Sequence, residues 1–509
     1  MTPVIVLFLL MLGAFYYSKR RTSNSYKPGA RKHTMEPVSS SMLLSEVDPT
    51  KAAQVHIVSF IVFETKLKFA DFRDRFVENV ILSDPDSRFV YRLDTSGLVS
   101  PPVWIKANNW HPFDNCLCTT NPQTEETIKA LLSERLTQPL DVTKPVWEMN
   151  FIDSFTPTKS GEAVSGVVLT MHHSMGDGFT LCHQIMRRAA PTEPGISMHE
   201  CYPFKSKADA RTGSSIRRFA TTLVKIVKSI IKLLLLKPDR PSALRNITSR
   251  RMDDRIVCDV GLLPASVDRL KKIANKASLS LGSQLHGKVF LNDIVVTACS
   301  MALGDLMKER HDVTSAIWIG LNRKSVIERP KHRRFDWGNE NLGTCYLQLP
   351  TGVKDPLLAL LQCHVRLSEM KDSPEPIVAN RLLSILGSVP LWILWPFRNL
   401  LMDKMSASIS NFPGPVKQIK IPVAPDGAPN KHTEGIGAVK EAFFLVAPPF
   451  KYGPYVTILS YCGNMYLAIS AAEKLMSQQT VSELVNVKVQ EAIDKIDRAL
   501  DSLIINNQT

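Results

Sequence analysis

Two adjacent histidines, an aspartate and two glycines lie within residues 171–178, whose sequence is MHHSMGDG. The segment follows an apolar, strand-like run and precedes a helical one. Because neighbouring side chains on a strand point to opposite faces, His172 and His173 cannot serve the same purpose. One is expected to face a cavity and the other to face packing. The two glycines permit a tight turn that folds Asp177 back beneath the histidines.

A histidine at the end of a strand, oriented by a nearby carboxylate, is suited to general base catalysis. A metal site is the rival interpretation. The spacing lacks the two histidines four residues apart on a helix that zinc peptidases use, and adjacent strand histidines diverge, so we expect no metal. Two purely structural histidines remain an alternative on these residues alone. The nine cysteines have no zinc-binding spacing and favour free thiols in a reducing compartment.

The elements that must position this segment alternate between strands and helices. Strand-like runs occupy residues 55–63 and 166–171, and residues 124–136 read as a helix. This alternation predicts an α/β or α+β fold. We place a first folded region at residues 41–204 and a second at residues 256–509.

The composition and charge point to a globular chain with membrane-facing parts. Of 509 residues, 44% are apolar and 22% are charged, which excludes a mostly disordered chain, a coiled coil and a collagen-like repeat. The net charge of +14 is concentrated before residue 33 and in residues 205–255, a crossover with 14 basic and 4 acidic residues. Basic zones beside apolar segments indicate an anionic membrane surface. Nucleic acid is the weaker alternative, since no zinc-finger, RNA-binding or basic-zipper motif is found.

The N-terminus reads as an uncleaved membrane anchor at residues 1–21. Residues 3–17 are almost wholly apolar, and three basic residues follow at once. A signal peptide, the alternative, would carry its positive charge before the apolar run. Charge after the run directs the rest of the chain to the cytosol. Residues 22–40, rich in Ser, Lys and Pro, are expected to form a flexible tether.

Residues 219–237, inside the basic crossover, are expected to form a helix in the membrane interface. Lys225, Lys228 and Lys232 fall on one face of this helix, and apolar residues cover the remainder. A basic stripe beside a wide apolar face is typical of helices that lie on a membrane. The alternative is an amphipathic helix packed on its own domain. The apolar stretch at 382–397 fits either a hairpin dipping into lipid or a buried wall.

An ordered set of motifs resembles one family. Residues 172–178 match the HHxxxDG motif of CoA-dependent acyltransferases. The other elements resemble those of the wax ester synthase/diacylglycerol acyltransferase family: QPLD at 138–141, KPVWE at 144–148, LND at 291–293, LNR at 321–323, residues 339–349, SNFPGP at 410–415 and LSYCGN at 459–464. The set covers the chain from about residue 40 to its end, and it most resembles the eukaryotic, membrane-associated members.

The resemblance implies two chloramphenicol acetyltransferase-like domains with a tunnel between them. Acyl-CoA would enter from one side and a long-chain fatty alcohol or diacylglycerol from the other, giving a wax ester or triacylglycerol. Acyl-CoA is a co-substrate, and no bound cofactor is expected. The expected location is the endoplasmic reticulum membrane with the catalytic body in the cytosol, the plasma membrane or lipid droplets being alternatives. Another hydroxyl or amine acceptor, or a non-catalytic lipid-binding protein, are the alternative functions.

The resemblance also assigns roles within the catalytic motif. His173 corresponds to the family's catalytic histidine, and we expect it to accept the alcohol proton and then protonate the CoA thiolate. His172 is expected to face the structure, and Asp177 to hold the turn and the histidine loop.

The substrate-binding residues expected from the resemblance are Gly178, Asn292 and Asp293. Gly178 would let the backbone approach the substrate, and Asn292 would orient groups at the reacting centre, where donors stabilise an oxyanion. The chain departs from the family pattern at Phe412, where valine is commoner, and at Cys462, where asparagine is commoner. Both are expected near the tunnel and bear on the choice of acyl chain or alcohol.

Overall fold

The computed structural model describes residues 32–45, 55–83, 87–95, 102–158, 161–189, 224–232, 235–245, 254–263, 266–282, 285, 287–321, 338–339, 342–371, 373–390, 404–422, 436–448 and 453–508. The membrane anchor predicted at residues 1–21 lies outside this part of the chain, and so does the segment 391–397 of the second apolar stretch. Within the described residues, no helix is both long and apolar enough to cross a membrane.

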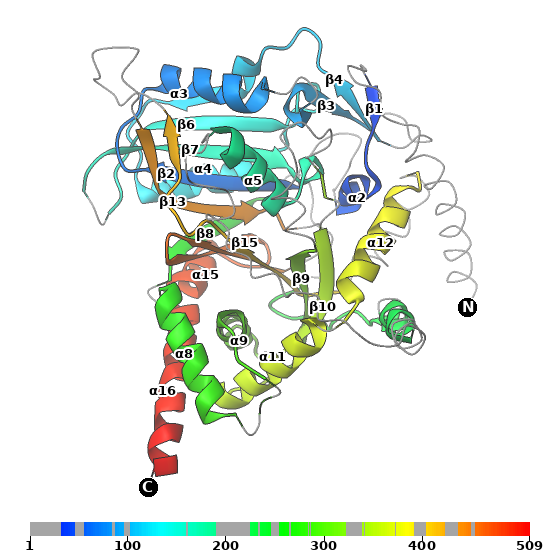
Figure 1. Ribbon diagram of the computed structural model, residues 1–509, viewed down its shortest axis with the longest axis vertical. Helices are drawn as coiled ribbons and strands as arrows, with labels where there is room; N and C mark the ends of the chain where they lie inside the picture. The colour runs from blue at the N-terminus through cyan, green and yellow to red at the C-terminus, as the bar shows by residue number, and fades with distance from the viewer. Residues whose placement is uncertain are drawn as a thin grey trace, which may run out of the picture.

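Two six-stranded sheets organise the described residues (Figure 1). The first has the order β12-β13-β2-β7-β6-β5. Its strands are β2 (His56–Phe63), β5 (Cys116–Thr119), β6 (Trp147–Phe155), β7 (Val164–His172), β12 (Lys420–Pro422) and β13 (Ile436–Val446). Strands β2 and β7 confirm the strand-like runs predicted from the sequence. Both are central and mostly buried, which explains their nearly continuous apolar sequences.

The first sheet is completed by strands from the second half of the chain. Strand β13 pairs antiparallel with β2, and β12 pairs with β13. Residues 420–446, which sequence patterns assigned to the second region, therefore contribute two strands to the sheet of the first. This crossing places side chains from both halves on one sheet face.

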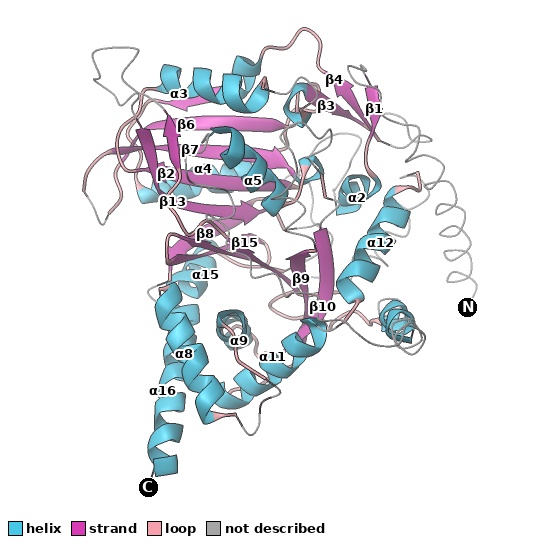
Figure 2. Cartoon of the chain, in the orientation of Figure 1, coloured by secondary structure: helices cyan, strands magenta, loops and turns pink. Residues whose placement is uncertain are grey.

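Helices and a small sheet cover the first half (Figures 1 and 2). The helical elements are α3 (Phe69–Phe76), a π-helical turn at Val77–Ile81, short 3-10 turns at Arg88–Val90 and Pro112–Asn115, α4 (Glu125–Thr137) and α5 (Gly178–Ala189). The small sheet has the order β1-β4-β3, with β1 at Lys32–Thr34, β3 at Tyr91–Asp94 and β4 at Val103–Lys106. Helix α4 confirms the helix predicted at 124–136. It begins where the Thr124 hydroxyl accepts a hydrogen bond from the Thr127 backbone N–H.

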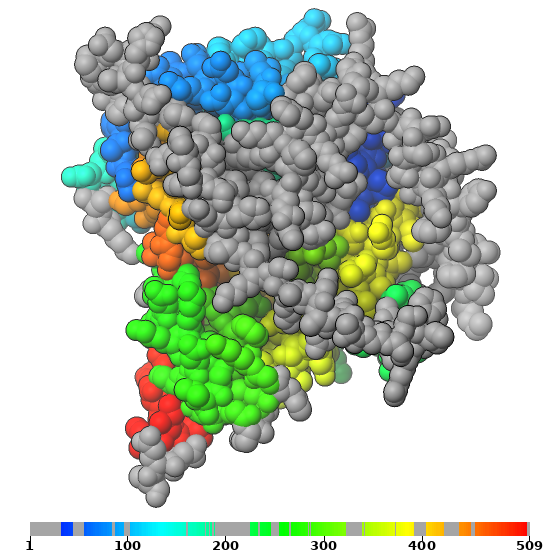
Figure 3. Space-filling view, in the orientation of Figure 1, coloured from blue at the N-terminus to red at the C-terminus, as the bar shows by residue number. Residues whose placement is uncertain are grey.

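The second half is a sheet covered by helices. Its strand order is β10-β9-β11-β14-β15-β8. The strands are β8 (Ile256–Leu262), β9 (Val313–Gly320), β10 (Leu342–Leu349), β11 (Ala407–Pro413), β14 (Tyr455–Tyr461) and β15 (Asn464–Ala472); the helices are α8 (Val267–Ser280), α9 (Leu291–Asp305), α11 (Pro356–Lys371), α12 (Glu375–Gly387), α15 (Gln478–Glu483), a π-helical turn (Leu484–Lys488) and α16 (Val489–Gln508). Helices α8, α11 and α16 pack around α9. In the space-filling view, α8 and α16 form the lower left of the molecule (Figure 3).

The tether predicted for residues 22–40 is wrong for residues 32–40. Residues Lys32–Thr34 form β1, which pairs with β4, and Pro37–Ser41 form α2, which continues into a 3-10 turn at Met42–Ser45. Helix α2 packs so closely on α12 that a Cβ at Gly387 would overlap the Pro37 carbonyl. Serine and proline content suggested flexibility, but Pro37 starts a helix whose remaining residues are buried against distant parts of the chain.

The helix predicted at 219–237 is described over residues 224–232 and lies beside α12 (Figure 1). Its inner face packs Ile226 and Ile230 against α12. Lys232 does not belong to a free basic stripe, because its Nζ lies 2.7 Å from the buried Glu375 carboxylate. Four apolar residues on the helix and just after it are exposed, namely Val224, Val227, Ile231 and Leu235. The described helix therefore combines packing against the protein with an exposed apolar ridge.

Candidate active site

His173 lies directly after β7, in a 3-10 turn at His173–Met175. Its backbone N–H donates to the carbonyl of Val55, 2.8 Å away, which ties the turn to the start of β2. His173 lines a small cavity together with Asp177, Gly178 and Asn411. The histidine is thus within reach of a molecule in that cavity.

Burial lowers the pKa of His173 from its ordinary value of 6.5 to about 4. Hydrogen bonds to its own backbone and to Asn339 act in the opposite direction, while electrostatic repulsion from the neighbouring His172 ring lowers the pKa of His173 further. Burial dominates because it disfavours the charged imidazolium. At neutral pH the ring is therefore uncharged and has a nitrogen lone pair that can accept a proton.

His172 faces the interior of the protein instead. Its side chain is fully buried, and Nδ1 lies 2.6 Å from the Ser174 hydroxyl. The ring is edge-on to His56, whose Nδ1 in turn lies 3.0 Å from the carbonyl of Arg135. The structure thus places the two histidines in different environments, because His172 ends β7 and His173 begins the 3-10 turn that follows.

Asp177 caps a helix. One carboxylate oxygen accepts from the Thr180 backbone N–H at 2.9 Å, and the other accepts from the Thr180 hydroxyl at 2.9 Å. The Asp177 backbone carbonyl accepts the first main-chain bond of α5, from Leu181. Aspartate is a preferred residue at this position, because it satisfies a backbone N–H that the helix leaves unpaired. These bonds hold the turn that carries His173 onto the start of α5.

The two glycines of the motif have different surroundings. A Cβ at Gly176 would lie 3.1 Å from Leu181 and 3.3 Å from the backbone nitrogen of Gly338, so this position is tightly packed. A Cβ at Gly178 would meet no protein atom within 4 Å. Gly178 instead lines the small cavity and a second, larger one.

Asn292 reaches the site through another residue. Its side-chain oxygen accepts a hydrogen bond of 2.6 Å from Asn411, and Asn411 lines the cavity beside His173. Asn292 stands in the first turn of α9, whose N-cap is Phe290. The motifs that contain Asn292 and Asn411 are thus joined directly behind the cavity.

Asp293 has a different environment from the one expected for a substrate-binding residue. It is fully buried, and its carboxylate lies 2.8 Å from His364 Nδ1 and 3.4 Å from Lys371 Nζ, both on α11. It also accepts from the Phe290 backbone N–H, which fixes the start of α9. Asp293 is not among the residues that line either of the two cavities.

Two further residues hold the histidine loop: Arg88, which sequence patterns did not single out, and Asn339, the first residue of the motif at 339–349. Arg88 is buried, and its guanidinium donates to the carbonyls of Ser174 and Met175 at 2.9 and 3.2 Å. A second guanidinium nitrogen is paired with the Glu36 carboxylate. From the other half of the chain, the buried Asn339 donates to the carbonyl of His173 at 2.8 Å. The loop is therefore held from both halves, through contacts between residues far apart in sequence.

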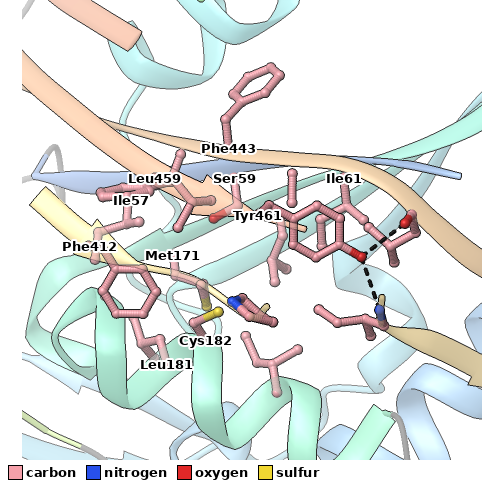
Figure 4. A pocket seen from close by; sticks show the side chains of 18 of the residues that line it. Ile57, Ser59, Ile61, Met171, Leu181, Cys182, Phe412, Phe443, Leu459 and Tyr461 are labelled. Atoms are coloured by element: carbon pink, nitrogen blue, oxygen red, sulfur yellow. Dashed lines mark hydrogen bonds between the residues drawn. The ribbon is translucent and has the colours of Figure 1, made fainter. Parts of the chain in front are cut away.

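The larger cavity adjoins the smaller one and is almost entirely apolar. It lies between β2, β7 and β13 on one side and α5 with residues 412–421 on the other (Figure 4). Its empty volume of about 890 Å³ includes space that is open to solvent. Both cavities share Ile57, Gly178, Phe412 and Phe444. The rings of Phe412 and Phe444 meet edge to face with centroids 6.2 Å apart. A molecule with a polar reacting end at His173 and a long apolar chain would fill both spaces.

Cys462, one of the two positions where the chain departs from the family pattern, is not among the residues that line the two cavities. Cys462 is exposed and has a positive φ of 48°, followed by Gly463 with a φ of 81°, in the turn between β14 and β15. Such two-residue turns favour Asn-Gly, because asparagine tolerates the left-handed conformation better than cysteine does. Phe412, in contrast, is placed where it was expected, at the junction of the cavities.

The arrangement suits proton transfer next to an apolar chain. An uncharged buried histidine can accept a proton from a hydroxyl and return it to a leaving group. Among the described residues, no group of His, Cys, Asp and Glu side chains is arranged to hold a metal ion.

Comparisons with known proteins agree with the motifs. The model of the wax ester synthase/diacylglycerol acyltransferase catalytic domain matches residues 37–251, and that of the WS/DGAT C-terminal domain matches residues 337–495. Wax ester synthase/diacylglycerol acyltransferase 11 of Arabidopsis thaliana is 22% identical over 336 residues, covering 58% of this chain and 64% of the relative. Number 5 of the same plant is 23% identical over 348 residues, covering 59% and 64%. The chain thus spans somewhat less than two thirds of the length of these curated relatives.

Solved structures show a similar fold. The wax ester synthase/diacylglycerol acyltransferase from Marinobacter aquaeolei VT8 is 16% identical with a TM-score of 0.53, covering 94% of this chain and all of that one. The trichothecene 15-O-acetyltransferase from Fusarium sporotrichioides is 10% identical with a TM-score of 0.59, covering 94% and 98%. The starter condensation domain of rhizomide synthetase, solved with C8-CoA, is 12% identical with a TM-score of 0.55, covering 94% and 97%. The mixed α/β architecture with two such domains is therefore the fold of this chain.

Proposed function

This chain belongs to the wax ester synthase/diacylglycerol acyltransferase family, and from that premise we propose that it transfers a fatty acyl group from acyl-CoA to the hydroxyl of a long-chain alcohol, of diacylglycerol, or of both. The observation that carries the proposal is the position of His173, uncharged at neutral pH, beside a large apolar cavity. The C8-CoA complex of the rhizomide condensation domain supports acyl-CoA as the donor, since that domain has a similar fold.

In the proposed mechanism, His173 acts first as a base and then as an acid. It accepts the hydroxyl proton while the alcohol oxygen attacks the thioester carbonyl. The tetrahedral intermediate collapses, the carbon–sulfur bond breaks, and the imidazolium protonates the CoA thiolate. Because the buried imidazolium is acidic, its return to the neutral form favours protonation of the leaving group. The mechanism needs no covalent acyl-enzyme and no metal.

The other residues of the motif act by positioning. His172 and Asp177 hold the loop through Ser174 and Thr180 respectively. Asn292 acts through Asn411, which lines the cavity and is the candidate to orient the reacting carbonyl.

Asp293 supports the start of α9 and hence Asn292, and we propose this indirect role in place of substrate contact. Gly178 leaves room for the substrate at the junction of the two cavities.

The apolar substrates suggest work at a membrane surface. We propose that the protein acts at the endoplasmic reticulum membrane with its catalytic body in the cytosol. The exposed ridge of Val224, Val227, Ile231 and Leu235, close to Lys225 and Lys228, supports contact with an anionic bilayer.

The test is an assay of the full chain in lipid nanodiscs with palmitoyl-CoA and either hexadecanol or dioleoylglycerol. Free CoA thiol and ester product are measured together. Acceptor-dependent release of thiol with an equal amount of ester supports the proposal, and the ratio of the two esters gives the preferred acceptor. Thiol release only with another hydroxyl or an amine would favour that acceptor class. Absence of release with every acceptor would indicate a lipid-binding protein.

A further inference from the structure

The sheet side of the apolar cavity is lined by side chains that lie at increasing distance from His173 along β2. Each of these β2 residues, together with its paired residues on β7 and β13, is called a row. Residues two apart on a strand share a face, and the cavity is lined along β2 by Ile57, Ser59 and Ile61. The backbone of His173 is bonded to Val55, just before Ile57. Passing from Ile57 to Ile61 therefore leads away from the reacting histidine, over about 13 Å at the usual rise of a strand.

Residues on the neighbouring strands β7 and β13 complete the three rows. The register pairs Ile57 with Met171, Ser59 with Leu169 and Phe444, and Ile61 with Ala442, all of which line the cavity. The first two rows thus carry large side chains from β7 or β13. The third row differs, because β13 contributes only the methyl group of Ala442.

Beyond Ile61, the lining of the cavity includes a hydrogen-bonded wall. The Tyr461 hydroxyl accepts from the Ile419 backbone N–H at 3.0 Å and donates to the Val439 carbonyl at 2.9 Å (Figure 4). Val439 is paired with Phe63, one row beyond Ile61. Because Tyr461 is hydrogen-bonded to the backbone of both Ile419 and Val439, a hydrocarbon chain that contacts its ring cannot easily displace it.

We propose that this cavity measures the hydrocarbon chain of a substrate, and that Ala442 is the specificity-determining residue that sets its usable depth. The proposal rests on the proposed function, because it takes His173 as the reacting end of the cavity. The ligand class is an unbranched hydrocarbon chain, carried either by the acyl-CoA or by the alcohol.

A larger side chain at position 442 should shorten the cavity by one row. Ala442 lines the cavity, so a Leu or Phe there would occupy the third row, about 6.6 Å along the strand from the second. Excluding even two methylene groups from an apolar site reduces affinity about tenfold, so the loss of a whole row should have at least that effect. The Ile61→Ala variant, opposite Ala442, has the reverse effect because it enlarges the same row.

The experiment compares wild type, Ala442→Leu, Ala442→Phe and Ile61→Ala as full chains in nanodiscs. One arm varies saturated acyl-CoA from C8 to C16 with a fixed alcohol, and the other varies the alcohol with a fixed acyl-CoA. We expect the two Ala442 variants to lower the C16-to-C8 ratio of kcat/KM at least about tenfold in one arm, leaving C8 nearly unchanged. Ile61→Ala should raise that ratio in the same arm. The arm that responds identifies the chain that the cavity holds.

Ala438→Phe is the matched control. Ala438 lies on the same strand and is also only partly buried, but it is not among the residues that line the cavity. An equal change of chain-length profile in Ala438→Phe, or an unchanged profile in the Ala442 variants, would overturn the proposal.

Equilibrium binding of the same acyl-CoA and alcohol series separates this proposal from the proposed function. If wild type binds chains but makes no ester, the proposed function fails, and the effect of Ala442 on chain-length preference in binding decides the present proposal. If no chain binds, the cavity is not a chain site and the proposal is wrong.

Discussion

Helices α5 and α9 lie in the two halves of the molecule and are used in opposite ways. Residues 293–304 of α9 are buried without exception, between the second sheet and three other helices. Helix α5 instead lines an apolar cavity with Leu181, Cys182 and Ile185. Apolar side chains that line unfilled space make fewer contacts, which lowers the free energy of unfolding. The comparison indicates that α9 contributes stability, whereas α5 contributes to the wall of the site, which residues of both halves complete.

Two buried histidines show the same contrast. His364, in the second half, lies 2.8 Å from the Asp293 carboxylate, inside a network that includes Lys371. His173, in the first half, lines a cavity and has a pKa lowered to about 4 by burial. The histidine that is paired with a carboxylate is thus not the one beside the cavity, so proximity of His and Asp in space does not by itself identify the catalytic residue.

The largest effect is expected from His173→Ala. Removal of a general acid and base should reduce ester formation by roughly 10²–10⁴-fold. Because the ring lines a cavity, the melting temperature should change little. Turnover near that of wild type would show that another residue is the catalytic base. The matched variant His172→Ala should act mainly by lowering stability. A stable but inactive His172→Ala would show that His172, and not His173, is the catalytic residue.

The reverse pattern is expected from His364→Ala. This change removes a partner from the buried Asp293 carboxylate and should lower the free energy of unfolding by about 2–3 kcal/mol. Denaturant unfolding and turnover measured on the same preparation test it. Full stability combined with lost turnover would place His364, and not only His173, in the catalytic machinery.

Gly178→Ala tests whether the space beside Gly178 is occupied by substrate. Its added methyl group would meet no protein atom within 4 Å, so the fold should be unaffected. If substrate occupies that space, a displaced substrate should react about 10–100-fold more slowly. Gly176→Ala is the control, since its methyl group would press on Leu181 and reduce stability. Normal kinetics in Gly178→Ala would show that the substrate lies elsewhere.

The smallest effect is expected at the turn between β14 and β15. Cys462→Asn replaces a residue with a φ of 48° by one that tolerates it and should raise stability by about 0.5–1 kcal/mol. Chain-length preference should not change, because Cys462 is exposed and does not line the cavities. Thermal unfolding tests the first expectation, and a changed product profile would contradict the second.

Local features of the site could be predicted from the sequence, and contacts across the fold could not. Strands 55–63 and 166–171 follow from periodicity, whereas the different surroundings of His172 and His173 arise where β7 ends and the 3-10 turn begins. The pairing of β13 with β2 depends on where the chain returns after more than 350 residues, which no local pattern encodes. The contacts of Arg88 and Asn339 with the histidine loop could not be predicted for the same reason, since each joins residues far apart in the sequence.

Two side chains were assigned to the wrong kind of contact because their local pattern fits more than one environment. Asp293 reads as part of a substrate motif, yet it belongs to a buried network with α11. Lys232 reads as part of a basic stripe, yet it is paired with Glu375. In both cases the deciding partner lies more than 70 residues away.

The central claim is that His173 acts as an uncharged base, and the pH dependence of kcat/KM tests it most directly. The base works only when unprotonated, so activity should fall as pH decreases through the lowered pKa of about 4 and should persist through pH 6.5. The residual activity of His173→Ala should lack this acidic limb, with stability followed at each pH to exclude unfolding. An acidic limb near pH 6.5 in wild type, or the same limb in His173→Ala, would contradict the claim.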